Sequence, residues 1–212
     1  MIEKLACKLG RNDEVPNIEL AEALCAAEDA EGIGEIAEGL TSKDKAVAND
    51  CIKVLYEIGV RKPRLIAAQV DDFLSLLTSR NNRLVWGSMT ALATIADLVP
   101  DAIYEHIDRV LEVFHNGSVI AVDNSVTVLA KLCKASKAYE RHLLPILFEH
   151  LQECRPKEVP QHTERMSVCI TEGNAAGFLN ALDSRKEHLT AAQNARIKKL
   201  IKSMVSARTL KV

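Results

Sequence analysis

The sequence is poor in the residues that build β-rich and tightly turned folds. Only 4% of its 212 residues are aromatic, and it contains nine glycines and six prolines. A large β-sandwich uses more aromatic side chains and more turn residues. Because 48% of the residues are nevertheless apolar, the chain can bury a substantial core. This composition favours an all-helical protein.

Signals for export, membrane insertion and known catalytic chemistry are also missing. No apolar run approaches the ~20 residues that span a bilayer, and the stretch MIEKLACKLGRNDE lacks the apolar segment of a signal peptide. None of the six cysteines belongs to a Cys-x-x-Cys pair. There is no Gly-rich phosphate loop, no G-x-S-x-G and no H-E-x-x-H. We therefore expect a cytoplasmic, non-catalytic protein without a cofactor.

Charge is close to balanced overall but uneven along the chain. The net charge of -2 excludes no class of partner. Residues 1–40 carry ten acidic and three basic side chains, whereas residues 185–212 carry eight basic side chains and one acidic one. Such ends either keep terminal units soluble or pair head to tail between molecules. The sequence leaves the oligomeric state open.

The sequence contains an internal repeat of 37 residues. Leu-Thr-Ser recurs at residues 40 and 77, and proline recurs at residues 63 and 100. With this offset, apolar or small residues coincide in columns such as Leu55, Leu92, Leu129 and Met166; Ile58, Ile95, Leu132 and Cys169; and Cys51, Ser88 and Ser125. A shared period of this length indicates stacked units that bury a continuous core.

Each unit reads as two amphipathic helices. Residues 65–77 and residues 82–98 both place apolar side chains at i, i+3, i+4 and i+7, and proline cannot continue a helix interior at the unit ends. We predict a right-handed α-solenoid of about five helix pairs in a single domain, 1–212. It comprises a degenerate unit at 1–40, regular repeats at 41–150 and irregular units at 151–212 that end in a basic helix.

Two segments resemble HEAT and armadillo repeats: VDDFLSLLTSRNNRLVWGSMTALATIA and HIDRVLEVFHNGSVIAVDNSVTVLAKL. The resemblance covers about residues 17–206 and identifies no subfamily. It implies that the second helix of each pair lines a concave groove. One enzymatic branch, deoxyhypusine hydroxylase, binds iron through His-Glu dyads, but this chain has only the reversed pairs Glu105-His106, Glu149-His150 and Glu187-His188.

The exposed column of the second helices is the predicted binding site. It is mixed in charge rather than basic, which favours a protein or peptide partner over phosphate. Trp86 is the expected anchor, because helical geometry places it at the edge of the core stripe; partial burial against a neighbouring helix is the alternative. The surrounding predicted residues are Asn49, Lys53, Thr90, Asp123, Thr127 and Lys131.

Three further possibilities follow from the C-terminal third. Nucleic acid could bind the basic last helix through Lys198, Lys199 and Lys202. His150, Cys154, His162 and Cys169 have metal-like spacing, but Cys169 and His162 occupy core columns, so we predict packing and no metal. Residues 154–160, within the proline-containing stretch 151–160, form either a projecting binding loop or a plain connection.

Overall fold

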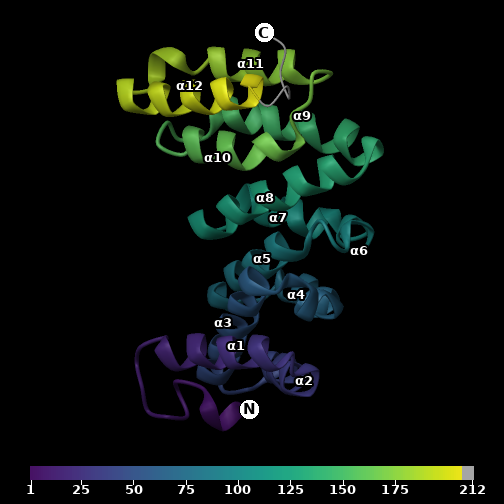
Figure 1. The fold of residues 1–212 in the computed structure, drawn as a ribbon, viewed down its shortest axis with the longest axis vertical. Coiled ribbons are helices and arrows are strands. Elements are labelled where there is room, and N and C mark those ends of the chain that lie inside the picture. The colour runs from purple at the N-terminus through teal and green to yellow at the C-terminus, as the bar shows by residue number, and fades with distance from the viewer. Residues whose placement is uncertain (207–212) are drawn as a thin grey trace. The chain divides into compact units, whose positions relative to one another are not determined.

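The chain is all-helical in the part that the structure describes. A computed structural model describes residues 1–206, and none of these residues forms a strand. Arg208 and Lys211 of the basic C-terminal region lie outside the described residues. The chain divides into two compact units, Met1–Ser125 and Val126–Val212, and the division falls within helix α8 (Figure 1).

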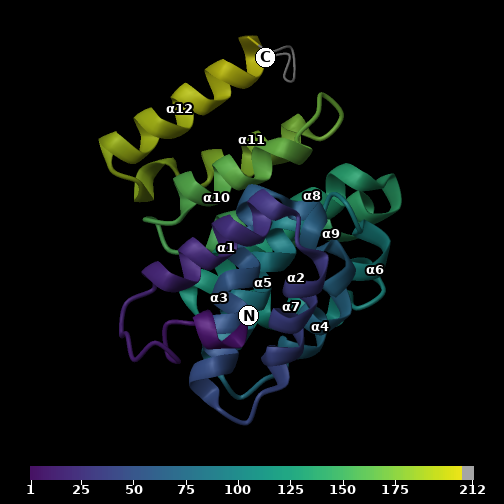
Figure 2. The ribbon, with the colours of Figure 1, turned by 60° about the horizontal axis from the view of Figure 1, so that its bottom comes forward.

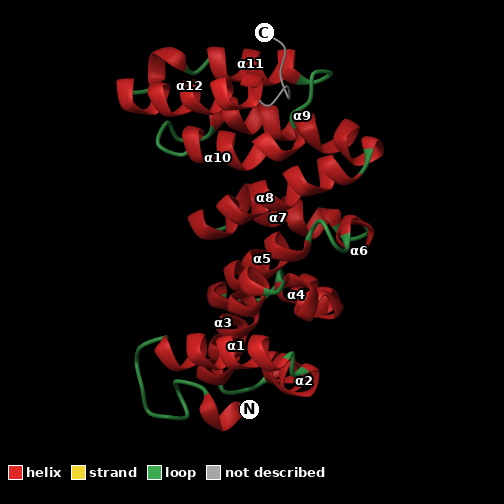
Figure 3. Cartoon of the chain, in the orientation of Figure 1, coloured by secondary structure: helices red, strands yellow, loops and turns green. Residues whose placement is uncertain are grey.

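Unit 1 holds most of the helices. Its elements are η1 (Ile2–Lys4), α1 (Val15–Ala27), α2 (Ala30–Glu38), η2 (Gly39–Thr41), α3 (Lys45–Arg61), η3 (Pro63–Gln69), α4 (Val70–Leu76), α5 (Asn82–Ile95), α6 (Pro100–Tyr104), α7 (Ile107–Asn116) and the first part of α8 (Val119–Ala135). A long loop precedes α1 (Figure 3).

The helices of unit 1 form two layers. In one layer α1 packs against α3, and α3 packs against α5; in the other, α2 contacts η3, which adjoins α4, and α4 contacts α6. Figure 2 shows α1, α3 and α5 on one side of this unit, with α2 and α4 on the other. The degenerate repeat at residues 1–40 therefore contributes α1 to the layer of second helices, next to α3.

The repeat columns form the core, as the sequence predicts. Leu55, Leu92, Leu129 and Met166 are all fully buried, as are Ile58, Ile95 and Leu132. The small-residue column of Cys51, Ser88 and Ser125 is also fully buried. At Gly87 an added Cβ would lie 2.6 Å from Cγ1 of Ile52. Small residues are needed here because α3 and α5 approach each other closely.

Some helices begin and end where the capping residues and prolines of the sequence predict, and others do not. Asn81 caps α5, and its side chain accepts a hydrogen bond from the Arg83 amide. The expected helix over 65–77 consists of η3 followed by α4, because Pro63 begins a tighter 3-10 segment. The expected helix over 82–98 ends at Ile95.

Unit 2 continues the alternation of helices. It contains the rest of α8, then α9 (Lys137–Glu153), α10 (Val159–Met166), η4 (Ser167–Cys169), α11 (Ala175–Asp183), η5 (Lys186–His188) and α12 (Ala191–Ser206). Here α9 packs against α10 and α11, and α10 packs against α12. A capping box begins α12: the Thr190 amide lies 2.8 Å from Oε1 of Gln193, and the Gln193 amide lies 3.3 Å from Oγ1 of Thr190. Across residues 1–206, no helix combines the length and apolar character needed to cross a membrane.

Candidate functional site

The predicted binding column lies on α3, α5 and α8. Asn49 and Lys53 are on α3, and Trp86 and Thr90 are on α5. Because α3 packs against α5, these residues occupy neighbouring helices of unit 1. Asp123 is in the part of α8 that belongs to unit 1, whereas Thr127 and Lys131 belong to unit 2. We call the surface around Glu14, Lys53, Glu57, Arg83 and Trp86 the second-helix face.

Lys53 is buried rather than exposed, which corrects the expectation from the column. Only 8% of its side chain is accessible, and its ammonium lies 3.0 Å from Oε2 of Glu14 and 2.7 Å from Oε1 of Glu57. The ammonium is also 4.8 Å from the centre of the Tyr56 ring. Burial alone would lower the pKa of Lys53, but hydrogen bonds to Glu57, Tyr56 and Glu14 raise it above its ordinary value. Lys53 therefore lies beneath this face, and its ammonium holds the carboxylates of Glu14 and Glu57 in position.

Glu14 joins the N-terminal segment to the second helices. It is the residue before α1, and its carboxylate pairs with both Lys53 and Arg83 of α5. Burial would raise the pKa of Glu14, but the hydrogen bonds from Arg83 and Lys53 bring it below its usual value. Glu14 therefore stays ionised and connects α3 to α5.

The ion pairs continue along α3. Glu57 accepts hydrogen bonds from Lys53 and Arg61, and Arg61 also lies 2.9 Å from Oε1 of Glu22 on α1. Burial would raise the pKa of Glu57, but these two cations lower it. Counting Glu14 and Arg83, the network contains three acids and three bases. Its charges are balanced within the protein, so the network itself offers no excess of cations to phosphate.

Trp86 is partly buried and partly accessible to solvent, so it combines the two alternatives that the sequence left open. Its side chain is half-buried, and its ring centroid lies 5.8 Å from that of the buried Tyr56, with the planes tilted by 46°. The guanidinium of Arg83 lies 4.6 Å from the centre of the indole ring. One part of the indole is thus supported by the protein, and the rest is accessible to solvent.

The polar residues of the column are half-buried and largely hydrogen-bonded within the protein. These contacts fix their orientation. They join Asn49 to Asn81 at 2.8 Å, Thr90 to Asn124 at 2.9 Å and, within unit 2, Thr127 to Arg165 at 2.6 Å. Asp123 and Lys131 are also half-buried.

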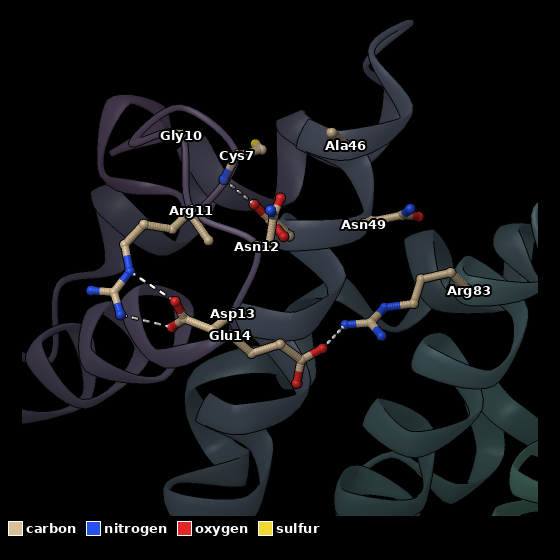
Figure 4. A pocket seen from close by; sticks show the side chains of 11 residues that line it. Cys7, Gly10, Arg11, Asn12, Asp13, Glu14, Ala46, Asn49 and Arg83 are labelled. Carbon is tan, nitrogen blue, oxygen red and sulfur yellow. Dashed lines mark hydrogen bonds and ion pairs between the residues drawn. The ribbon is translucent and has the colours of Figure 1, made fainter.

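A polar pocket of about 470 Å³ lies beside the second-helix face. Figure 4 shows Arg11 and Asp13 at one side, Arg83 at the other, and Glu14 pointing toward Arg83. The Cys7 amide donates to Oδ2 of Asp50 at 2.8 Å, which fixes the N-terminal segment against α3. The pocket is lined by Ala6, Cys7, Gly10, Arg11, Asn12, Asp13, Glu14, Ala46, Asn49, Asp50 and Arg83.

Sequence reasoning missed the contributions of Glu14, Arg83 and the N-terminal segment. Lys53, Glu57 and Arg61 are spaced by four residues on one helix, which is a recognisable ion-pair signal. Glu14 lies before the first repeat, so no column contains it. Only the folded chain brings it to Lys53 and Arg83.

The basic last helix and the stretch 154–160, which the sequence offered as alternative sites, both lie in unit 2. Lys198, Lys199 and Lys202 are exposed on α12, and Lys198 lines a pocket of about 520 Å³. The expected loop at 154–160 is shorter, because α10 begins at Val159, and both Val159 and Pro160 are buried. The connection is therefore a compact turn between α9 and α10, which favours the plain connection over a projecting loop.

Comparison with known sequences finds a distant relative and no family. No protein-family model matches the chain. An uncharacterized protein of Methanocaldococcus jannaschii is 26% identical over 124 residues, and the match spans 56% of this chain and 60% of that protein.

Similar solved structures share the fold at low sequence identity. An engineered protein is 18% identical and has a TM-score of 0.66, with 100% of this chain and 99% of that one covered. A designed armadillo repeat protein in complex with the peptide (KR)4 is 13% identical, with a TM-score of 0.63 over 89% of this chain and 91% of that one. Kap121p bound to Pho4p is 14% identical, with a TM-score of 0.63 over 89% of this chain and 21% of Kap121p. The fold is an α-solenoid of the HEAT and armadillo type.

Proposed function

We propose that this protein is a non-catalytic scaffold whose second-helix face binds a segment of another protein, and that this segment carries basic side chains. The observation that carries the proposal is the half-buried Trp86, which Arg83 and Tyr56 contact. Tryptophan, tyrosine and arginine are the residues most enriched at the energetic centres of protein interfaces. A partly buried indole also loses little conformational freedom when a partner binds.

The charge of unit 1 supports a basic partner. Residues 1–125 contain 21 Asp and Glu side chains against 12 Lys and Arg. Since the cations of the second-helix face are already paired with Glu14, Glu57 and Glu22, the acidic excess of unit 1 acts on an approaching ligand. Complementary charge raises association rates and selects among partners.

The solved structures of similar fold are consistent with this proposal. One neighbour is a designed armadillo protein in complex with the peptide (KR)4, and another is Kap121p bound to Pho4p. Within unit 1, Asn49, Thr90 and Asp123 are the proposed contacts around Trp86. Thr127 and Lys131 belong to unit 2 and are not part of the proposed site.

The protein's single tryptophan gives a direct assay. Peptides of equal length that are Lys/Arg-rich, neutral or Glu/Asp-rich are titrated while the fluorescence of Trp86 is recorded. We expect a saturable change with the basic peptide, weakened by salt because surface charges are screened. Failure of all three peptides to bind at low salt would overturn the proposal.

The role of Trp86 is tested by fluorescence anisotropy of a labelled basic peptide. We expect Trp86→Ala to weaken binding about 30-fold, the effect of an interface residue worth about 2 kcal/mol, with unchanged far-UV circular dichroism. The control is Val168→Ala, which removes an exposed apolar side chain of unit 2. Equal affinity of the Trp86→Ala variant and the wild type would remove Trp86 from the site.

Nucleic-acid binding by α12 is a second candidate, favoured by the exposed lysines and by the charge of unit 2. Residues 126–212 carry 15 Lys and Arg against eight Asp and Glu. If Lys198, Lys199 and Lys202 contact phosphate, changing all three to alanine lowers the slope of log affinity against log salt by about 2–3 for duplex DNA. A variant with Lys43 and Lys45 replaced is the control. An absence of DNA and RNA binding at low salt excludes this function.

A further inference from the structure

The fourth repeat departs from the others at two positions that are 12 residues apart. His162 stands in the column of Cys51, Ser88 and Ser125, where the other repeats have a small buried residue. His150 stands in the column of Leu76 and Val113. One histidine in such a column would be an isolated exception to the repeat pattern. Two histidines in the same repeat form a local cluster of imidazoles.

The structure brings these histidines together with Cys154. His150 is in the last turn of α9, Cys154 directly follows α9, and His162 is on α10. One ligand atom from each of the three side chains lies within 4.8 Å of the other two. His162 is fully buried, Cys154 is 9% exposed, and His150 is half-buried.

The two imidazoles already contact each other through potential ligand atoms. Nε2 of His150 lies 2.9 Å from Nδ1 of His162, and the ring centroids are 4.9 Å apart. In such a pair one nitrogen donates and the other accepts, so the accepting nitrogen carries a lone pair at this point. A metal ion bound here would take both nitrogens as ligands. The donating ring would release this proton to solvent and take one from solvent on its other nitrogen, so that both rings stay neutral.

We propose that His150, Cys154 and His162 form a three-ligand site for Zn²⁺, with the fourth position occupied by solvent. Two imidazole nitrogens and one thiolate suit this ion, at Zn–N and Zn–S distances of about 2.0–2.1 and 2.3 Å. Tetrahedral bonds of these lengths place two nitrogens, or a nitrogen and the sulfur, about 3.3–3.6 Å apart. The two imidazole nitrogens, now 2.9 Å apart, would separate by about 0.4 Å. The Cys154 sulfur, which lies within 4.8 Å of the ligand atoms of both histidines, would approach them by about 1.3 Å at most.

Cys154 supplies the thiolate by releasing a proton. Burial raises the pKa of the Cys154 thiol to about 11, so in the metal-free protein the sulfur keeps its proton. On binding, the Zn–S bond forms, the S–H bond breaks and the proton leaves to solvent. Arg185, whose Nη2 lies 2.6 Å from the Cys154 carbonyl oxygen, places a positive charge close to the sulfur that favours the thiolate.

Cys169 does not belong to the site, although its spacing had suggested a four-residue grouping. Its thiol lies 3.1 Å from the Met166 carbonyl oxygen, and it fills the core column of Ile58, Ile95 and Leu132. A metal ion bound by the other three residues would join the end of α9 to α10 across the turn at residues 154–158. The ion would therefore stabilise unit 2.

The experiment uses the reduced, full-length protein without a histidine tag, and Co²⁺ as a spectroscopic substitute for Zn²⁺. We expect one Co²⁺ per chain, with a sulfur-to-cobalt charge-transfer band in the near ultraviolet and displacement by Zn²⁺. Zn²⁺ should also raise Tm. The absence of this band at micromolar protein and excess Co²⁺ would overturn the proposal.

Matched variants separate the site from adventitious binding. Cys154→Ser should abolish the charge-transfer band, and the half-buried His150→Gln should weaken Co²⁺ binding at least tenfold without disturbing the metal-free fold. Cys169→Ser, which changes another buried thiol of unit 2, should bind Co²⁺ as the wild type does. If the band survives Cys154→Ser or disappears in a folded Cys169→Ser protein, the assignment is wrong.

Discussion

Replacing Lys53 by alanine should destabilise unit 1 strongly, although the sequence places Lys53 in a solvent-facing column. The substitution removes three buried methylene groups, which cost about 0.8 kcal/mol each. It also removes the ammonium from Glu14 and Glu57. Hydrogen bonds to charged groups contribute about 1.5–3 kcal/mol, but both carboxylates keep an arginine partner, and Glu14 is 43% exposed. We therefore expect a total loss of about 3–4 kcal/mol.

Lys53→Met divides this loss into its two parts. Methionine keeps most of the apolar stem and removes only the charge, so we expect a loss of about 1–2 kcal/mol. The pKa values of Glu14 and Glu57 are lowered in the folded protein. Their stabilising contribution is therefore present above the ordinary carboxyl pKa of 4.5 and is lost as the pH falls through the lowered folded-state values. The difference between wild type and Lys53→Met should accordingly shrink below about pH 4.5.

The measurement is urea unfolding followed by Trp86 fluorescence, which reports on unit 1, and by far-UV circular dichroism, which reports on both units. The exposed Lys199→Ala on α12 is the matched control and should change the free energy of unfolding by less than about 0.5 kcal/mol. A loss below about 1 kcal/mol for Lys53→Ala would refute the buried position of its ammonium. So would a difference between wild type and Lys53→Met that stays constant from pH 7 to pH 4.

Two further perturbations test the packing and the helix ends. Gly87→Ala should destabilise the protein by about 1–2 kcal/mol in urea unfolding, because its Cβ would meet Ile52 and overpacking outweighs the gain in helix propensity. Gly34→Ala on α2 has open space around the new Cβ and should instead stabilise by about 0.5–1 kcal/mol; the same sign for both would contradict the close approach of α3 and α5. Thr190→Ala should cost about 1 kcal/mol of unit 2 stability by removing the capping box, whereas the exposed Ser203→Ala should not; thermal melting compares them.

The fold was predictable because burial repeats along the chain. The columns at a 37-residue offset each specify one layer of the core, and the buried residues Leu55, Leu92 and Leu129 occupy equivalent positions. The sequence could not predict that the chain divides within α8. That division depends on how tightly successive repeats pack, and the apolar pattern of the repeats is the same on both sides of it.

The candidate site was predictable only in part, for a physical reason. A column records which side of its own helix a residue occupies, and Trp86, expected at the edge of the core stripe, is half-buried. It does not record what a segment outside the repeat brings against that side. Lys53 was expected to be exposed because Glu14 belongs to no column, yet the Glu14 carboxylate lies 3.0 Å from its ammonium.

Repeats also show where one unit departs from its equivalents, and in this chain such departures coincide with unusual environments. Thr90 and Thr127 stand where the preceding repeat has Lys53, and Lys53 is the buried centre of an ion network. Asn49 and Asp123 stand where the repeat between theirs has Trp86, and the Arg83 guanidinium lies 4.6 Å from the centre of the Trp86 ring. Equivalent positions of successive repeats have similar surroundings, so a residue of different size or polarity must be compensated by new contacts or given a use. For Lys53 the compensation is present in Glu14 and Glu57. For Trp86 the compensation by Arg83 and Tyr56 leaves part of the indole exposed, and that remaining surface is what makes it the better candidate for recognition.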